Sequence, residues 1–304
     1  AEDGGRVVAG GVLTVPSGSM FAFMDTYEAA GTGFKVSRRV KVLRAADDLG
    51  FSTKISFVMA ESDDPRDYWC FAPGVWYKQN EFAPDTVIGK DLDCEYFWRM
   101  ETCYALPLFA MQHTRSGETA SLSRWAADVT MPSTDILRAE NHTDPKCTTG
   151  AIGMSRPESL TLNYMYYGFP VRKPFETKVD GLSIDYVYPG CDGQLPSQNR
   201  FLGLDYRGKT KSFRRINHPV VDGFEQHYAV AVQLGRYDSF QRMMRDNWRI
   251  VYERMRDRLF EVDNERHFHN CMKHLERYTR KYGDSYGLPF AAQLPHMDIS
   301  TVSF

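Results

Sequence analysis

Hydrophobic and polar residues alternate along much of the first 235 residues of the chain. In residues 33–45 (GFKVSRRVKVLRA), Phe34, Val36 and Val40 alternate with charged side chains, which is the two-residue period of a strand with one solvated face. Runs of similar character follow at 51–60, 95–104, 106–112, 118–127, 158–169, 182–188 and 225–234. Turn sequences separate them and no helical period intervenes. The pattern therefore predicts a mainly β fold, a large antiparallel β-sandwich over residues 1–235.

The period changes at Asp238. From there to residue 260, hydrophobic side chains recur at three- and four-residue steps, which predicts an amphipathic helix with Asp238 or Ser239 as its N-cap. The expected apolar stripe consists of Phe240, Met244, Trp248, Val251, Met255 and Leu259. A second amphipathic stretch at 264–283 stops at Gly283, a residue typical of the position after a helix. We expect residues 236–304 to contain a C-terminal helical hairpin with a tight link near 261–264.

The two ends of the chain suggest a piece of a larger protein. After Gly283 the tail has no closing signal, and its apolar residues Ile299, Val302 and Phe304 need a partner. The first residues, AEDGG, are typical of a processed secreted protein or of a segment cut from a longer chain. They give a weak indication of an extracytoplasmic location.

Charge and composition limit the classes of binding partner that we expect. The net charge of −2 gives no electrostatic reason to expect nucleic acid or an anionic membrane surface. No apolar run approaches the roughly 18–20 residues of a membrane span, so no membrane is expected either. The six cysteines are scattered without a CxxC pair and do not decide the redox state.

An aromatic stretch at residues 67–82 (DYWCFAPGVWYKQNEF) is the first candidate for ligand binding. Pro73-Gly74 predicts a turn in its middle, with Trp69 and Trp76 on either side. In one interpretation the rings form a platform for a saccharide, because flat rings cover the C–H faces of a sugar while polar neighbours bind its hydroxyls. The ligand-binding residues would then be Trp69, Trp76, Tyr77, Asp67 and Asn80. In the other interpretation the tryptophans are ordinary core.

Two groups of carboxylates could provide acid–base chemistry. They are Glu61, Asp63, Asp64 and Asp67, and further along Asp91, Asp93 and Glu95. Glycoside hydrolysis needs two carboxyl groups about 5–10 Å apart, but neighbours on one loop are commonly just solvated. No GxSxG, HExxH, P-loop or dinucleotide-binding motif is present. The catalytic residues therefore stay unknown, and the missing motifs weigh against a self-contained enzyme.

One short segment resembles a metal site. In HFHNCMKH, His267, Cys271 and His274 would share one face of a helix and could offer N, S and N ligands to zinc. The competing interpretation places Cys271 beside a core stripe of Phe268, Met272 and Leu275. We favour the second and expect neither a metal nor a cofactor.

The layout as a whole resembles the N-terminal region of bacterial six-hairpin glycosidases. The most specific piece is FAPGVWYKQNEF (71–82), which is similar to an aromatic-Pro-Gly-x-x-Tyr-x-x-Asn segment of their galactose-mutarotase-like sandwich. FWRMETCYALPLFAMQ (97–112) is similar to the strand pair that follows. In such proteins linker helices join the sandwich to an (α/α)6 barrel, which usually supplies the general acid and base. The sequence pattern of this chain predicts only two helices, fewer than such a barrel needs.

The resemblance implies a carbohydrate-associated domain of a glycoside hydrolase that contributes scaffold or sugar contacts rather than catalysis. Its expected partners are an oligosaccharide or polysaccharide and an (α/α)6 barrel of the same protein. The alternative is a structural or protein-interaction β-sandwich with no ligand of its own. Binding to an array of glycans would separate the two.

Overall fold

A computed structural model of the chain describes most, though not all, of its residues. The described ranges are 2–3, 5–48, 50–78, 96–130, 143–155, 160–162, 165–166, 169–170, 175–177, 181–195, 213–256 and 263–287. The chain divides into two compact units, Ala1–Arg254 and Met255–Phe304, and each is described by itself. The described residues form a mainly β structure with two helices, which confirms the predicted fold class.

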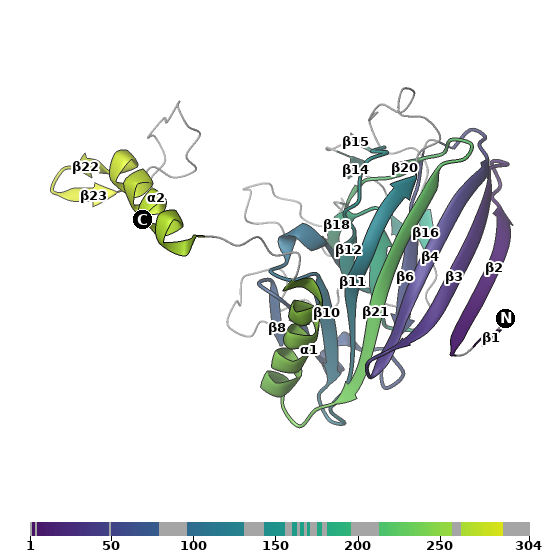
Figure 1. Ribbon diagram of the computed structural model, residues 1–304, viewed down its shortest axis with the longest axis horizontal. Helices are drawn as coiled ribbons and strands as arrows, with labels where there is room; N and C mark the ends of the chain where they lie inside the picture. Colours follow the sequence, from purple (N-terminus) through teal and green to yellow (C-terminus); the bar gives the residue numbers. More distant parts are fainter. Residues whose placement is uncertain are drawn as a thin grey trace. The chain divides into compact units, whose positions relative to one another are not determined.

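The first unit contains a nine-stranded antiparallel sheet in the order β1-β2-β3-β4-β21-β11-β10-β7-β8 (Figure 1). Its strands are β1 (Glu2–Asp3), β2 (Arg6–Thr14), β3 (Met20–Ala30), β4 (Gly33–Arg44), β7 (Tyr68–Ala72), β8 (Trp76–Lys78), β10 (Leu108–His113), β11 (Glu118–Thr130) and β21 (Glu225–Arg236). The centre of the sheet joins distant parts of the sequence, because β21 lies between β4 and β11.

A second, six-stranded sheet has the order β19-β18-β9-β12-β17-β6. Its strands are β6 (Thr53–Val58), β9 (Tyr96–Met100), β12 (Ala151–Ser155), β17 (Ser183–Tyr188), β18 (Cys191–Leu195) and β19 (Phe213–Arg215). Short pairs join β5 (Gly50–Phe51) to β20 (His218–Pro219), β13 (Leu160–Leu162) to β16 (Phe175–Thr177), and β14 (Met165–Tyr166) to β15 (Phe169–Pro170). Two 3-10 turns are η1 (Pro65–Asp67) and η2 (Glu101–Cys103).

The main hydrophobic core lies between the inner faces of the two sheets. Side chains at alternate positions of both sheets meet there, as the two-residue period requires. Tyr186 of β17 stacks on Tyr228 of β21 with ring centroids 5.6 Å apart, and Tyr188 lies 4.9 Å from the same ring. The two sheets therefore pack as a β-sandwich.

A smaller apolar cluster lies under β3 and β4 and contains Phe21, Val40, Val42, Val220 and Phe224. The rings of Phe51 and Phe21 add to it, with centroids 5.1 Å apart. This cluster extends the core toward the β1–β3 side of the large sheet.

His218 is a buried polar group beside this cluster. Its Nε2 donates to the carbonyl oxygen of Cys147 at 2.9 Å, and its Nδ1 accepts from Nε2 of Gln226 at 3.1 Å. Thr53 in turn donates to Oε1 of Gln226 at 2.5 Å. Burial lowers the pKa of His218 from its ordinary value of 6.5 to about 4. The imidazole is therefore neutral at physiological pH, with its proton on Nε2.

Helix α1 (Phe240–Met255) belongs, apart from its last residue, to the same unit as the sandwich and contacts β7 and β11 of the large sheet (Figure 1). Ser239 begins it, because its side-chain oxygen accepts from the backbone N–H of Arg242 at 3.3 Å. Its buried side chains are Phe240, Met243, Asn247 and Val251. The predicted stripe was therefore wrong at Met244 and Trp248, whose places on the buried face are taken by Met243 and Asn247.

The sheet beneath α1 explains this change of face. Ser121 and Ser123 of β11 point toward the helix and are almost fully buried. The hydroxyl of Ser121 donates to Oδ1 of Asn247 at 2.5 Å, and Nδ2 of Asn247 donates to the carbonyl of Met243 at 2.9 Å. Arg254 donates to Oγ of Ser123 at 2.8 Å. The small polar side chains of β11 therefore favour a polar residue on the helix face that packs against them. Hydrophobic periodicity alone does not reveal this preference.

The second unit contains α2 (Asn264–Tyr278), which is capped by Asp263, and a hairpin of β22 (Arg280–Tyr282) and β23 (Ser285–Gly287). The prediction that the helix reaches Gly283 was wrong. Gly283 lies in the turn of this hairpin, where its φ of 59° suits a residue without a Cβ. The predicted link at 261–264 falls largely outside the described residues, so the helical hairpin stays a prediction.

Candidate functional site

The turn predicted at Pro73-Gly74 is present and joins β7 to β8. The backbone N–H of Val75 donates to the carbonyl of Ala72 at 2.9 Å, and Gly74 has a φ of 83°. Proline at the second position and a glycine with positive φ at the third are typical of a type II turn. The hairpin pairs Phe71 with Tyr77 and Ala72 with Trp76. The turn thereby fixes which aromatic side chains share a face of the sheet.

Trp76 points into the core of the sandwich. Its side chain is 1% exposed, and its ring lies edge-on to Phe109 with centroids 6.3 Å apart. Its Nε1 donates to the carbonyl of Lys78 at 2.8 Å. The core interpretation of this residue therefore holds, and Trp76 offers no ring face to a ligand.

Trp69 points to the opposite face of the sheet, toward α1. Its ring is half-buried and meets the ring of Phe240 edge-on, with centroids 6.1 Å apart. The ammonium of Lys78 lies 4.9 Å from the centroid of the same ring, a cation–π contact. Phe71, two residues along the strand, packs against Phe240 in the same way at 6.4 Å. Trp69 thus helps to hold the first turn of α1.

Tyr77 is the exposed ring of this set. Its side chain is 44% exposed, its ring lies 5.7 Å from Phe71, and its hydroxyl accepts from the backbone N–H of Gly74 at 2.9 Å. Asp67 lies at the other end of β7, about 13 Å away along an extended strand. Asn80 lies outside the described residues. The four predicted ligand-binding residues that the structure describes are therefore not gathered around one point.

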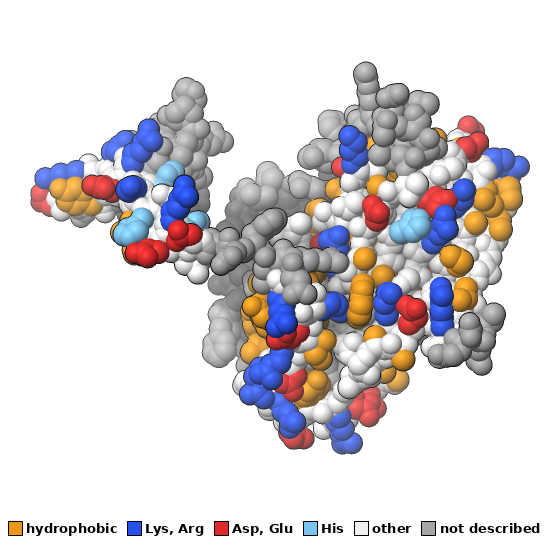
Figure 2. Space-filling view, in the orientation of Figure 1, with side chains coloured by type: hydrophobic (Ala, Val, Ile, Leu, Met, Phe, Trp, Pro, Cys, Tyr) orange, Lys and Arg blue, Asp and Glu red, His pale blue; other side chains and the backbone are white. Residues whose placement is uncertain are grey.

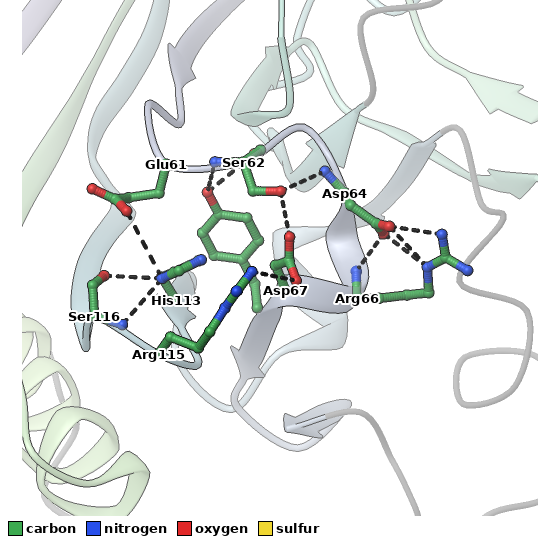
Figure 3. Close-up of polar contacts among 9 residues, drawn as sticks. Glu61, Ser62, Asp64, Arg66, Asp67, His113, Arg115 and Ser116 are labelled. Atoms are coloured by element: carbon green, nitrogen blue, oxygen red, sulfur yellow. Dashed lines mark hydrogen bonds and ion pairs between the residues drawn. The ribbon is translucent and has the colours of Figure 1, made fainter.

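The first carboxylate group lies on the acidic loop, residues 61–67, which precedes β7 (Figure 3). Asp64 caps η1 by accepting from the backbone N–H of Arg66 at 2.9 Å, and it also pairs with the Arg66 guanidinium at 2.7 Å. Asp63 accepts from the backbone N–H of Leu182 at 3.3 Å. These two carboxylates shape the loop and attach it to the neighbouring strand.

Asp67 also has a local structural role. It accepts from the hydroxyl of Ser62 at 2.6 Å and lies 3.7 Å from the guanidinium of Arg115 (Figure 3). The hydroxyl of Tyr68 accepts from the backbone N–H of Ser62 at 2.9 Å and donates to its carbonyl at 3.1 Å. Burial raises the pKa of Tyr68 to about 12, so the phenol stays protonated at neutral pH.

Glu61 meets residues that the sequence did not indicate. Its carboxylate lies 4.0 Å from Nδ1 of His113, and that nitrogen is 2.9 Å from the hydroxyl of Ser116 (Figure 3). A hydrogen bond with Glu61 and its negative charge raise the pKa of Glu118 above its ordinary range. His113 and Glu118 flank the turn between β10 and β11. No local motif marked them, because only the fold brings that turn beside the acidic loop.

The carboxylates of Glu61 and Glu118 are exposed and interact with each other. The second predicted group, Asp91, Asp93 and Glu95, lies outside the described residues.

The residues considered as zinc ligands lie on exposed α2. Nε2 of His267 is 3.6 Å from Sγ of Cys271. Across the described ranges, no three His, Cys, Asp or Glu side chains are grouped so as to hold a metal. Cys70, Cys103, Cys147 and Cys271 are free thiols. The helices of the described part of the chain are too short or too polar to span a membrane.

Compared with models of protein families, with curated proteins and with solved structures, the chain gave no significant match. The resemblance to six-hairpin glycosidases therefore stays a prediction that depends on the two quoted segments.

Proposed function

We propose that this chain is a non-catalytic scaffold of a larger carbohydrate-active protein. In this proposal the sandwich anchors α1, and α1 connects it to the part of the chain that follows. The observation that carries the proposal is the placement of the aromatic side chains in residues 67–82. Trp76 fills the core, while Trp69 and Phe71 hold Phe240 at the start of α1.

The acidic loop supports the same conclusion. Asp63, Asp64 and Asp67 each accept hydrogen bonds that shape or attach the loop. These carboxylates are therefore better suited to building a scaffold than to cleaving a glycosidic bond.

The anchoring role can be tested with Phe240→Ala. Truncating this buried ring should release the first turn of α1 and leave the core between the sheets intact, since Phe240 contacts the outer face of the large sheet. We expect amide exchange to accelerate in α1 and to change little in β12 and β17. Tyr252→Ala on the exposed side of the same helix is the matched control. Unchanged protection of α1 in Phe240→Ala would contradict an anchoring role.

The association with carbohydrate comes from the resemblance, and Tyr77 is the site residue with the most exposed ring. If a saccharide stacks on this ring, Tyr77→Ala should bind it roughly tenfold to hundredfold more weakly than the parent chain does. Tyr77→Phe keeps the ring and serves as control. Binding should be measured on a glycan array and by calorimetry, together with the melting temperature. If no saccharide binds, the carbohydrate association is withdrawn and the ligand-free structural domain is the better description.

Catalysis can be tested separately on a panel of aryl-glycosides and polysaccharides. We expect no turnover by this chain alone. Robust turnover that disappears in Glu61→Gln or Glu118→Gln would refute the non-catalytic assignment.

A further inference from the structure

One pair of metal-ligating side chains lies close together on α2. His267 and Cys271 are four residues apart, so they are neighbours on one face of the helix. Nε2 of His267 lies 3.6 Å from Sγ of Cys271, and both residues are exposed. Figure 2 shows histidine side chains, in pale blue, at the surface of the unit that contains α2. An imidazole nitrogen and a thiol sulfur are therefore held side by side at the surface.

The helix around this pair is capped at both ends. The side chain of Asp263 accepts from the backbone N–H of Arg266 at 2.9 Å. At the other end, the carbonyl oxygen of Leu275 accepts from the backbone N–H of Thr279 at 2.8 Å and from its hydroxyl at 2.6 Å. These bonds satisfy backbone groups that a helix leaves without partners at its ends. The regular turn between the two caps sets the spacing of the pair.

The separation of the two atoms matches what a tetrahedral zinc ion requires of two ligands. Zinc–nitrogen bonds in proteins are about 2.0–2.1 Å long and zinc–sulfur bonds about 2.3 Å. Two such bonds at the tetrahedral angle place the nitrogen and the sulfur about 3.5–3.6 Å apart. The separation of Nε2 and Sγ is 3.6 Å. An ion can therefore bind both atoms without a change in the helix backbone.

One chain supplies only half of the ligands that a structural zinc ion needs. Such ions have four ligands, and two cysteines with two histidines are a common set. Across the described residues, no third His, Cys, Asp or Glu side chain is grouped with this pair. A two-fold axis that brings the pairs of two chains together supplies two imidazoles and two thiolates. This completes the set, and the two thiolates balance the charge of the ion.

We propose that His267 and Cys271 form half of a zinc site, which the same two residues of a second copy of this chain complete. The side chains beside the pair favour a second helix over water in the two remaining positions. Phe268 and Leu275, from the predicted core stripe, lie next to Cys271 on the helix and are 60% and 40% exposed. A second helix at the ion covers part of this apolar surface, which water ligands leave exposed.

A shared tetrahedral ion also determines how the two helices meet. The plane through the ion and one chelating pair is perpendicular to the plane through the other pair. Each pair is aligned along its own helix, because its residues are about one turn apart. The two helices therefore cross steeply and touch over a short stretch. A contact of that size is too small to hold two chains together by itself, so the dimer should require the metal.

The experiment is a titration of the reduced full chain with Zn²⁺, followed by calorimetry and sedimentation velocity. We expect one ion for two chains, and a dimer that returns to monomer when a chelator is added. Co²⁺ is the spectroscopic probe, because a tetrahedral site with thiolate ligands gives it strong visible and charge-transfer absorption. Binding should weaken as the pH falls, since both ligands bind the metal in their deprotonated forms.

Four variants test whether this pair holds the ion. Cys271→Ser and His267→Ala should each weaken zinc binding by more than the roughly tenfold to hundredfold that loss of an outer-shell partner costs, and should remove the dimer. Cys103→Ser removes another exposed thiol and should bind zinc as the parent does. His269→Ala is the matched histidine control, because His269 points to the other side of α2 and lies 3.9 Å from Glu265. Circular dichroism verifies that each variant keeps its helices.

Three results would overturn the proposal. They are a parent chain that binds zinc no more tightly than Cys271→Ser, a complex of one ion with one chain that stays monomeric, and a zinc-dependent dimer that survives in both disrupting variants. The first would leave the pair as an ordinary hydrogen bond between a thiol and an imidazole. The second would mean that water or other groups of the same chain complete the coordination. The third would place the metal elsewhere on the chain.

Discussion

The two edges of the large sheet are both apolar, yet they differ in what covers them. At the β8 edge Trp76 is buried in the sandwich core, and on the opposite face Trp69 and Phe71 pack against α1. At the β2 edge Val12 and Leu13 are exposed in the part of the chain that the structure describes. Apolar composition therefore does not by itself give an edge strand its role. The segments that reach it decide whether its side chains are buried or exposed.

The largest expected effect that separates the two edges comes from Trp76→Ala. Removing this ring leaves a cavity in the core and should reduce the free energy of unfolding by about 3–5 kcal/mol. Chemical denaturation monitored by circular dichroism measures the loss. Tyr77→Ala, the next residue on the exposed face, should cost far less. A Trp76→Ala variant as stable as the parent chain would refute the core placement.

The second prediction concerns acid and the apolar cluster between the main core and the β2 side. The pKa of His218 is about 4 in the folded chain and about 6.5 when unfolded, so folding favours the neutral ring. Its contribution is fully present above pH 6.5 and is lost as the pH falls toward 4. The loss approaches about 3 kcal/mol over this window.

Denaturation curves between pH 7 and pH 4 should be compared for the parent chain and His218→Gln. The difference between the two pH profiles reports the contribution of His218, because the carboxylates that also titrate are the same in both proteins. Protonation is opposed by burial of the ring, and Gln226 already donates to Nδ1 while its own oxygen accepts from Thr53. Parallel pH profiles for the two proteins would contradict this account.

A smaller effect is expected where α1 meets the sheet. Asn247→Ala removes the acceptor for the buried hydroxyl of Ser121 and should cost about 1–2 kcal/mol. Ser121→Ala in the same chain removes the unsatisfied group, so the double variant should be more stable than the sum of the single losses predicts. Additive losses in this double-mutant cycle would mean that the pair is not coupled.

The smallest effect is expected at the β2 edge. Val12→Thr keeps the branched side chain on an exposed face and should change the free energy of unfolding by no more than about 0.5 kcal/mol in the monomer. The measurement should be made at low protein concentration. A loss above about 1 kcal/mol would show that this face is covered, and the contrast between the edges would disappear.

Several features could be predicted from local sequence because they depend on neighbouring residues. The alternation at 33–45 corresponds to β4, and the change of period at Asp238 corresponds to the start of α1. Pro73-Gly74 specified a tight turn. β2 could not be recognised in this way, because a strand exposed on both faces shows no alternation between polar and apolar positions.

The candidate site was harder to predict than the fold. Glu61 was named from the sequence. His113 and Glu118 lie beside it because the fold places the β10–β11 turn next to the acidic loop. Asp67 and Tyr77 are near in sequence but lie at opposite ends of β7. Proximity along a hairpin is therefore a poor guide to a binding site, because an extended strand carries its residues apart.

By itself the sequence determined the alternation of β4, the turn at Pro73-Gly74 and the start of α1, since these follow from neighbouring residues. Only the tertiary structure decided what each face meets. It placed Trp76 in the core and Trp69 against α1, and it turned Asn247 rather than Trp248 toward the sheet. The physical reason is that a period fixes direction, whereas burial depends on segments that are distant in the chain.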